Sequence, residues 1–109
     1  MSKENVAVEE VKEIGVGTYA FKKPAKIDGE EVKEISYDLT SINGSAIRRV
    51  KGALQKKNYT IILKDLDEVF HTALFAEAVG WTIDNVESLS AVDYMNIADI
   101  VRDFLLEQE

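Results

Sequence analysis

Hydrophobic and polar residues alternate through residues 18–39, and this period of two predicts β-strands rather than a helix. The turn between the strands is marked by Asp28-Gly29, because glycine accepts the positive φ that a tight two-residue turn requires. The apolar positions before the turn are Tyr19 and Phe21. Those after it are Ile35, Tyr37 and Leu39. The segment therefore predicts an N-terminal β-hairpin.

The register of this hairpin requires an irregularity. A simple two-residue turn pairs Phe21 with Ser36, which places the apolar residues of the two strands on opposite faces. One extra residue near Lys33–Glu34 restores the match, and it faces Pro24, which has no N–H group to give to a strand ladder. We therefore predict a β-bulge in the second strand, with two apolar pairs beyond it: Phe21 opposite Tyr37 and Tyr19 opposite Leu39.

Two stretches after the hairpin carry apolar residues at the spacings of three and four that are typical of an amphipathic helix. The first helix begins at Asn43 or Ser45, since both are good N-cap residues. The second begins near Asp65 or Asp67 and ends at Gly80, in the usual C-terminal role of glycine. The expected core stripes are Ala46, Ile47, Val50, Ala53 and Leu54 in the first helix, and Leu66, Val69, Phe70, Ala73 and Leu74 in the second.

A last helix starts at Ser90, which forms a capping-box pattern with Asp93. Its apolar residues cover more of its circumference than those of an ordinary surface helix: Tyr94, Ile97, Ala98, Ile100, Val101, Phe104 and Leu105. The second helix likewise carries Phe75 and Val79 on the side opposite to its core stripe. This surplus of apolar helix surface indicates contact with a partner as well as with the core of the same chain.

The remaining segments complete the predicted architecture. Residues 1–15 are polar and charged, so we expect a mobile N-terminal tail followed by a single domain over residues 16–109. Tyr59–Leu63 is short and β-branched, which leaves open a third strand beside the hairpin. Residues 81–89 are a connector with room for one short helical turn. The pattern predicts an α+β fold, in which the hairpin, with or without a third strand, packs on three to four helices.

Composition limits the chemistry that the chain can perform. Its 109 residues include no cysteine and a single histidine, His71, so neither a thiolate metal site nor a histidine-based catalytic set can be completed. His71 is expected at a helix surface or partly packed. No apolar run approaches the ~20 residues that span a membrane. We therefore expect no enzyme activity, no metal or cofactor site, no small-molecule substrate and no membrane contact.

Charge is distributed unevenly along the chain, whose net charge is −7. Residues 43–64 carry six bases and no acid, whereas residues 65–109 carry eleven acids and one base. The acidic part argues against a DNA-wrapping surface, which needs clustered positive charge. We interpret the basic segment as a solvated helix face or as a partner for the acidic helices of the same or a neighbouring subunit. Nucleic-acid binding is the alternative use of its bases, namely Arg48, Arg49, Lys51, Lys56 and Lys57.

Several short blocks follow one another in an informative order. They are Lys22-Lys-Pro24 and Asp28-Gly29 in the hairpin, Asp38-Leu-Thr-Ser-Ile-Asn-Gly44 at a helix start, Ala73 to Gly80 at a helix end, Trp81-Thr-Ile-Asp-Asn-Val-Glu-Ser-Leu89, Ala91-Val-Asp-Tyr94, and Val101-Arg-Asp-Phe-Leu-Leu106. In this order the blocks resemble the small tail assembly chaperones of long-tailed bacteriophages. The resemblance spans residues 18–106, and it is carried by the order and spacing of the blocks.

The resemblance implies a function in the cytoplasm of the host bacterium. Such chaperones bind the tape measure protein of the growing tail, keep it soluble until tail tube protein polymerises around it, and are absent from the finished virion. Trp81 is read equally as a partner anchor or as a cover for the core edge beside Gly80. The residues expected to bind the partner are Phe75, Val79, Trp81, Tyr94, Ile97 and Phe104.

Two other functions stay open at this point. One is a structural tail adaptor or completion protein that is retained in the virion. The other is a small nucleic-acid-binding regulator that uses the basic segment. A homo-oligomer is also compatible with the surplus of apolar helix surface.

Overall fold

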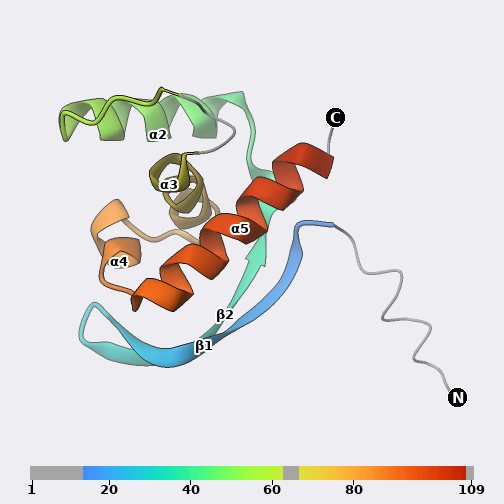
Figure 1. The fold of residues 1–109 in the computed structure, drawn as a ribbon, viewed down its shortest axis with the longest axis vertical. Coiled ribbons are helices and arrows are strands. Elements are labelled where there is room, and N and C mark those ends of the chain that lie inside the picture. Colours follow the sequence, from blue (N-terminus) through green and yellow to red (C-terminus); the bar gives the residue numbers. More distant parts are fainter. Residues whose placement is uncertain (1–13, 63–66, 108–109) are drawn as a thin grey trace, which may run out of the picture.

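The computed structural model describes residues 14–62 and 67–107 (Figure 1). An antiparallel hairpin of β1 (Val16–Ile27) and β2 (Glu30–Asp38) leads through the 3-10 turn η1 (Leu39–Ser41) into the helical part of the chain. The helices of the described residues are α2 (Gly44–Lys56), α3 (Glu68–Val79), α4 (Ile83–Glu87) and α5 (Ala91–Glu107). The predicted α+β fold is confirmed. Residues 1–13 of the predicted tail lie outside the described residues.

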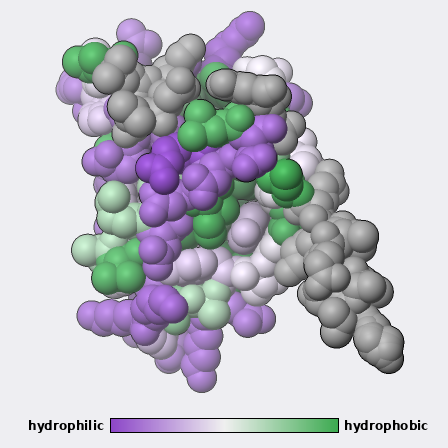
Figure 2. All heavy atoms as spheres, turned by 45° about the vertical axis from the view of Figure 1, so that its right-hand side comes forward, coloured by the Kyte–Doolittle hydropathy of each residue, from purple (hydrophilic) through white to green (hydrophobic). Residues whose placement is uncertain are grey.

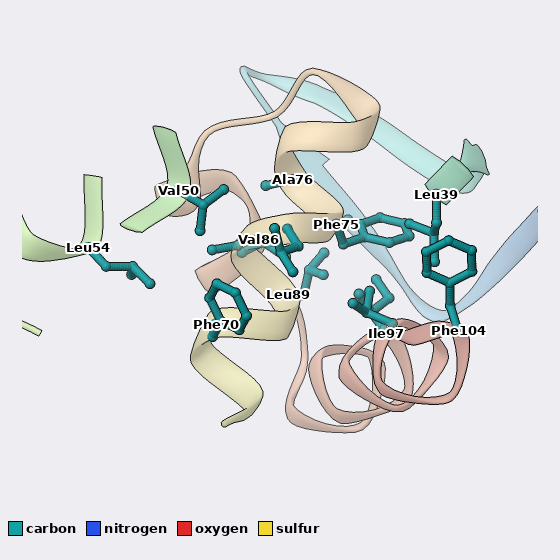
Figure 3. Packing of buried hydrophobic residues seen from close by; sticks show 14 of the residues in the cluster. Leu39, Val50, Leu54, Phe70, Phe75, Ala76, Val86, Leu89, Ile97 and Phe104 are labelled. Carbon is teal, nitrogen blue, oxygen red and sulfur yellow. The ribbon is translucent and has the colours of Figure 1, made fainter. Parts of the chain in front are cut away.

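Helix α3 lies at the centre of the molecule, where it contacts α2, α4, α5, β2 and η1 (Figure 1). All residues from Phe70 to Ala76 are buried. A helix that is hydrophobic all round belongs in a core, and α3 is therefore enclosed rather than amphipathic. In Figure 3, Phe70 and Phe75 leave α3 on different sides and both lie among buried side chains of the surrounding elements.

The hairpin turns at Asp28 and Gly29, whose φ angles of 53° and 87° confirm the predicted tight turn. The ladder is irregular around Pro24, as expected, but the extra residues lie in β1, so the predicted bulge in β2 is wrong. Four residues of β1, 21–24, lie between the paired residues Ala20 and Ala25, whereas one residue, 33, separates their partners in β2. The predicted pairs are wrong as well, because Tyr19 faces Ile35 and Tyr37 faces Gly17.

The physical reason for this bulge is a partner that is distant in sequence. The backbone N–H groups of Lys22 and Lys23, inside the bulge, donate hydrogen bonds to the carboxylate of Asp93 in α5, at 2.9 and 3.1 Å. Buried backbone donors need such partners when they leave a strand ladder. The alternation of residues along the hairpin carries no information about this partner, so local reasoning placed the extra residues in the wrong strand.

The helix boundaries follow local capping chemistry. The side chain of Asn43 accepts a hydrogen bond from the N–H of Ala46 at 3.0 Å, and that of Asp67 accepts one from Phe70 at 2.9 Å, so both predicted N-caps are confirmed. Gly80 ends α3 in the left-handed conformation with φ 81°, as predicted. The short helical turn expected between α3 and α5 is α4.

No third strand forms in residues 59–62, and Leu63 lies outside the described residues. Asn58, with φ 62°, reverses the chain after α2, and the N–H of Tyr59 then donates to the carbonyl of Leu54 at 2.9 Å. The segment therefore returns along α2, on the far side of α3 from the hairpin (Figure 1). The hydroxyl of Tyr59 donates to Asp67 at 2.8 Å, and this hydrogen bond raises the pKa of Tyr59 to about 12.

Gly15 provides a test of how the hairpin meets α5. Its φ is 89°, and a Cβ atom at this position would overlap the ring of Phe104. We expect Gly15→Ala to lower the free energy of unfolding by about 2–4 kcal/mol, since it combines overpacking with backbone strain. In the matched control Gly52→Ala, inside α2 with no atom within 4 Å of the new Cβ, stability should rise by about 0.5–1 kcal/mol. Urea unfolding measures the stability of both variants. Equal unfolding midpoints for the two would contradict the packing of Gly15 against Phe104.

Candidate partner-binding surface

No group of three or more histidine, aspartate and glutamate side chains in residues 14–62 and 67–107 is placed to hold a metal ion. His71 is only 2% exposed, so the expectation of a surface or partly packed histidine is wrong. The reason is the central position of α3, which is covered on all sides. None of the helices in the described residues is both long enough and apolar enough to cross a membrane.

The six residues predicted to bind a partner do not form one exposed surface. Phe75 and Ile97 are 0% exposed and Phe104 is 8% exposed, so these three belong to the core and that part of the predicted surface is wrong. The ring of Tyr37 in β2 lies over Phe75, with ring centres 5.6 Å apart. The apolar surface around Phe75 is thus covered by the hairpin of the same chain. The other three residues, Val79, Trp81 and Tyr94, are half-buried.

Trp81 joins the hairpin to the end of α3. Its ring stacks on Phe21 of β1, with centres 6.2 Å apart and planes 14° apart, and meets the edge of Phe75 at 6.4 Å. Phe21 in turn contacts Tyr19 edge to face at 5.4 Å. Such offset and edge contacts are favourable arrangements for aromatic rings. Trp81 therefore covers the core edge beside Gly80, which is one of the two roles predicted for it.

The other side of Trp81 borders a groove of about 300 Å³ between α2, α3 and the start of α4. The groove is predominantly apolar, and three of its lining residues, Val50, Ala73 and Ala76, are themselves buried. The apolar residues that line it are Val50, Ala53, Ala73, Ala76, Trp81 and Ile83. Sequence reasoning missed this groove, except for Trp81, because its walls come from three helices whose relative placement no local pattern fixes.

Two ion pairs bridge the helices that form the groove. The guanidinium of Arg49 in α2 donates to Glu77 of α3 at 2.6 and 2.9 Å. At the other end of α2, the ammonium of Lys57 donates to Asp84 of α4 at 3.0 Å, and this hydrogen bond raises the pKa of Lys57. The groove thus has a basic wall on α2 and an acidic wall on α3 and α4. For these two bases, the predicted pairing with acidic helices of the same chain is confirmed.

The large exposed hydrophobic residues lie in three segments: Ile14 before β1, Tyr59 and Ile62 after α2, and three residues of α5. Those on the outer side of α5 are Val92, Met95 and Leu106. Between them Arg102 lies 3.6 Å from Asp99 and 3.7 Å from Asp103. On the face shown in Figure 2, hydrophobic side chains form separate patches among hydrophilic ones. Single exposed hydrophobic residues are normal on soluble domains. The groove is therefore the better candidate for a binding site.

Asp93 holds the hairpin against the helices. Its carboxylate is 0% exposed. It accepts hydrogen bonds from the hydroxyl of Tyr19 at 2.6 Å and from that of Ser90 at 2.9 Å, in addition to the two backbone N–H groups of the bulge. The side-chain amide of Asn96 donates to the Tyr19 oxygen at 3.0 Å. The predicted capping interaction is present, since the N–H of Asp93 donates to the Ser90 hydroxyl at 3.3 Å.

These contacts shift the pKa of both ionisable partners. Burial alone raises the pKa of Asp93, but the hydrogen bonds from Tyr19, the bulge and Ser90 outweigh it and leave that pKa below its usual value. Burial and the hydrogen bond to Asp93 raise the pKa of Tyr19. The sequence offered one signal for this network: Asp93 lies four residues before Ile97, on the apolar stripe of α5. A lone acid on such a stripe indicates a buried partner.

Comparisons with protein-family models, with curated proteins and with solved structures find no match to this chain. The relevant features are a groove with walls of opposite charge, an aromatic cluster at one side of it, and a buried carboxylate that fixes the hairpin.

Replacing Asp93 tests whether its network holds the fold together. We expect Asp93→Asn to lower the free energy of unfolding by about 2–4 kcal/mol at pH 7, because charge-assisted hydrogen bonds are lost and an amide donor faces other donors. The control is Asp99→Asn, on the exposed side of α5, which should change stability by less than about 0.5 kcal/mol. Urea unfolding at neutral pH measures both.

The same pair of variants tests the pKa of Asp93. Because this pKa is lower in the folded than in the unfolded protein, its contribution to stability is present above pH ~4 and is lost as pH falls further. The wild type and Asp99→Asn should therefore lose more stability than Asp93→Asn between pH 5 and pH 2.5, two working values that bracket ~4. Parallel pH profiles for all three proteins would show that Asp93 does not titrate as the geometry requires.

Proposed function

We propose that the protein is a tail assembly chaperone of a long-tailed bacteriophage, which acts in the cytoplasm of the host. It binds the tape measure protein and keeps it soluble while tail tube protein assembles around it. The observation that carries the proposal is the position of the sequence blocks that resemble this family. They include Pro24 in the bulge, Asp28-Gly29 at the turn, the N-cap Asn43, the helix end Gly80 and the buried Asp93.

These positions determine the fold, so a shared pattern at them supports a shared architecture. A turn with positive φ, a cap and a buried carboxylate each restrict the residue types that can occupy them. The blocks are therefore more informative together than their length suggests. The resemblance then supplies the client, which is a long helical protein with exposed apolar faces.

The surface chemistry also suits a chaperone. A net charge of −7 on 109 residues favours solubility of a complex with an apolar client. The groove between α2, α3 and α4 is lined mainly by apolar side chains. Of the five bases named for the nucleic-acid alternative, two, Arg49 and Lys57, pair with Glu77 and Asp84 of the same chain.

Co-expression tests the proposed function. The client is the long coiled-coil protein encoded beside this one in the same phage or prophage genome. We expect the client to be insoluble alone and to co-elute with this protein in size-exclusion chromatography with light scattering, because its apolar faces are then covered. An unrelated acidic domain of similar size serves as the control. A client that stays insoluble in both cases would contradict the proposal.

Mass spectrometry of purified phage particles separates the chaperone from a structural tail protein. A chaperone leaves the assembly when the tube closes around the tape measure protein, so its peptides should be absent from the particle. Tube and tape measure peptides in the same sample are the internal control. Stoichiometric recovery of this protein from particles would contradict the chaperone function and support a tail adaptor or completion protein instead.

A further inference from the structure

We propose that the outer side of α5 is an interface between two copies of this chain, whose α5 helices pair in antiparallel orientation about a two-fold axis. This surface is separate from the groove, and the inference does not depend on the proposed function. It is carried by one stripe of residues along α5, called here the outer stripe: Val92, Met95, Asp99, Arg102 and Leu106.

The outer stripe lies on one side of the helix and is accessible. Its residues follow one another at steps of three, four, three and four, which is the spacing of the a and d positions through which paired helices meet. All five are between 42% and 57% exposed, so they are surface rather than core. The buried residues of α5 lie on the opposite side of the helix. In Figure 1, α5 passes in front of the other elements.

The outer stripe is complementary to itself. Its four residues from Met95 to Leu106 are placed symmetrically about the midpoint between residues 100 and 101. A two-fold axis through this point brings Met95 of one copy beside Leu106 of the other, and Asp99 of one beside Arg102 of the other. Each contact occurs twice, as the symmetry of such a dimer requires. Two apolar pairs therefore flank two pairs of opposite charge.

This pattern identifies both the occupant and its direction. An unrelated partner imposes no relation between the two halves of the stripe, whereas a second copy requires that residues at equal distances from the axis match. A parallel pair of helices in register instead places each Asp99 beside Asp99 and each Arg102 beside Arg102, where like charges repel. The antiparallel pair is the arrangement in which every charge at the centre meets its opposite.

The central charges are available for contacts between copies. Within one chain Arg102 lies 3.6 Å from Asp99 and 3.7 Å from Asp103, and both distances are too long for a direct hydrogen bond. Arg49, by contrast, donates to Glu77 at 2.6 Å. A guanidinium group has five N–H donors. Arg102 can therefore bond Asp99 of the second copy and keep Asp103 of its own chain nearby. Polar residues at such positions fix the register of paired helices.

The expected dimer is weak. The outer stripe is about 21 Å long at ~1.5 Å per residue, and one helix from each copy forms a contact at the low end of specific interfaces. The net charge of −7 on each chain also opposes association. We therefore expect a dissociation constant on the order of 10–100 μM.

Charge-reversal variants test the pairing between copies. Asp99→Arg leaves two bases at the centre of the stripe and Arg102→Asp leaves two acids, so neither variant is complementary to itself. A mixture of the two restores both charge pairs. Sedimentation velocity over about 5–500 μM, a range that brackets this affinity, should show dimers for the wild type and the mixture. Each variant alone should associate at least tenfold more weakly.

Two controls accompany the charge-reversal variants. Glu34→Arg makes the same change of charge as Asp99→Arg but at an exposed position of β2, and it should dimerise like the wild type. Circular dichroism should be the same for all of these proteins, because every substituted side chain is largely exposed.

Cross-linking tests the antiparallel register. The chain has no cysteine, so single cysteines can be introduced without side reactions. Met95→Cys and Leu106→Cys, mixed in equal amounts and oxidised, should form a disulfide-linked heterodimer, because the two positions face each other and a disulfide bond requires Cα atoms within about 7 Å. Met95→Cys alone is the control, since its two thiols would lie roughly 16 Å apart along the helix axis.

Each measurement has a result that overturns the inference. These results are a wild type that stays monomeric over the whole concentration range, a mixture of charge variants that associates no better than either variant alone, and cross-linking of Met95→Cys alone as readily as in the mixture. A dimer that forms equally well in every variant is likewise built on another surface. None of the measurements includes a client, so their failure leaves the proposed chaperone function standing.

Discussion

The buried carboxylate of Asp93 is the interaction on which the arrangement of hairpin and helices depends. A two-stranded hairpin is marginal in water on its own, so β1 and β2 need an external support. Asp93 provides it by accepting the backbone donors of the β1 bulge together with the Tyr19 hydroxyl. With the bulge fixed, Phe21 reaches Trp81 and the opposite strand brings Tyr37 over Phe75. A single acid on α5 thus orients the sheet that closes the core.

Features determined by neighbouring residues were predictable from the sequence. The turn at Asp28-Gly29, the caps at Asn43 and Asp67 and the end of α3 at Gly80 each depend on residues within one helical turn or one tight turn. A side chain that bonds a backbone group three residues away leaves its signature in the sequence itself. For this reason the turn, these caps and the order of the hairpin and helices, and with them the α+β class, followed from local chemistry.

Features determined by distant residues were not predictable in the same way. The Asp93 carboxylate meets Lys22 across 71 positions of the chain, and no alternation pattern encodes that meeting. The helical wheel of α3 showed two apolar sides, but it does not distinguish a partner protein from the hairpin of the same chain as the cover for Phe75. The groove depends on how α2, α3 and α4 meet, and no local pattern fixes that arrangement. Trp81 was identified from the sequence as a candidate contact residue because an aromatic residue directly after a helix end stands out however the helices are arranged.

The packing of Gly15 on Phe104 also determines how the domain would respond to mechanical load. Ile14 and Glu107 border one hollow of about 340 Å³, so the first and last parts of the described chain come together at one corner, beside the end of α5 (Figure 1). Tension applied between them acts first on the contact of Gly15 with Phe104 and on the hydrogen bond from the N–H of Leu39 to the carbonyl of Gly15. None of the residues that line the groove takes part in these two contacts. Load at this corner is therefore carried first by residues outside the groove.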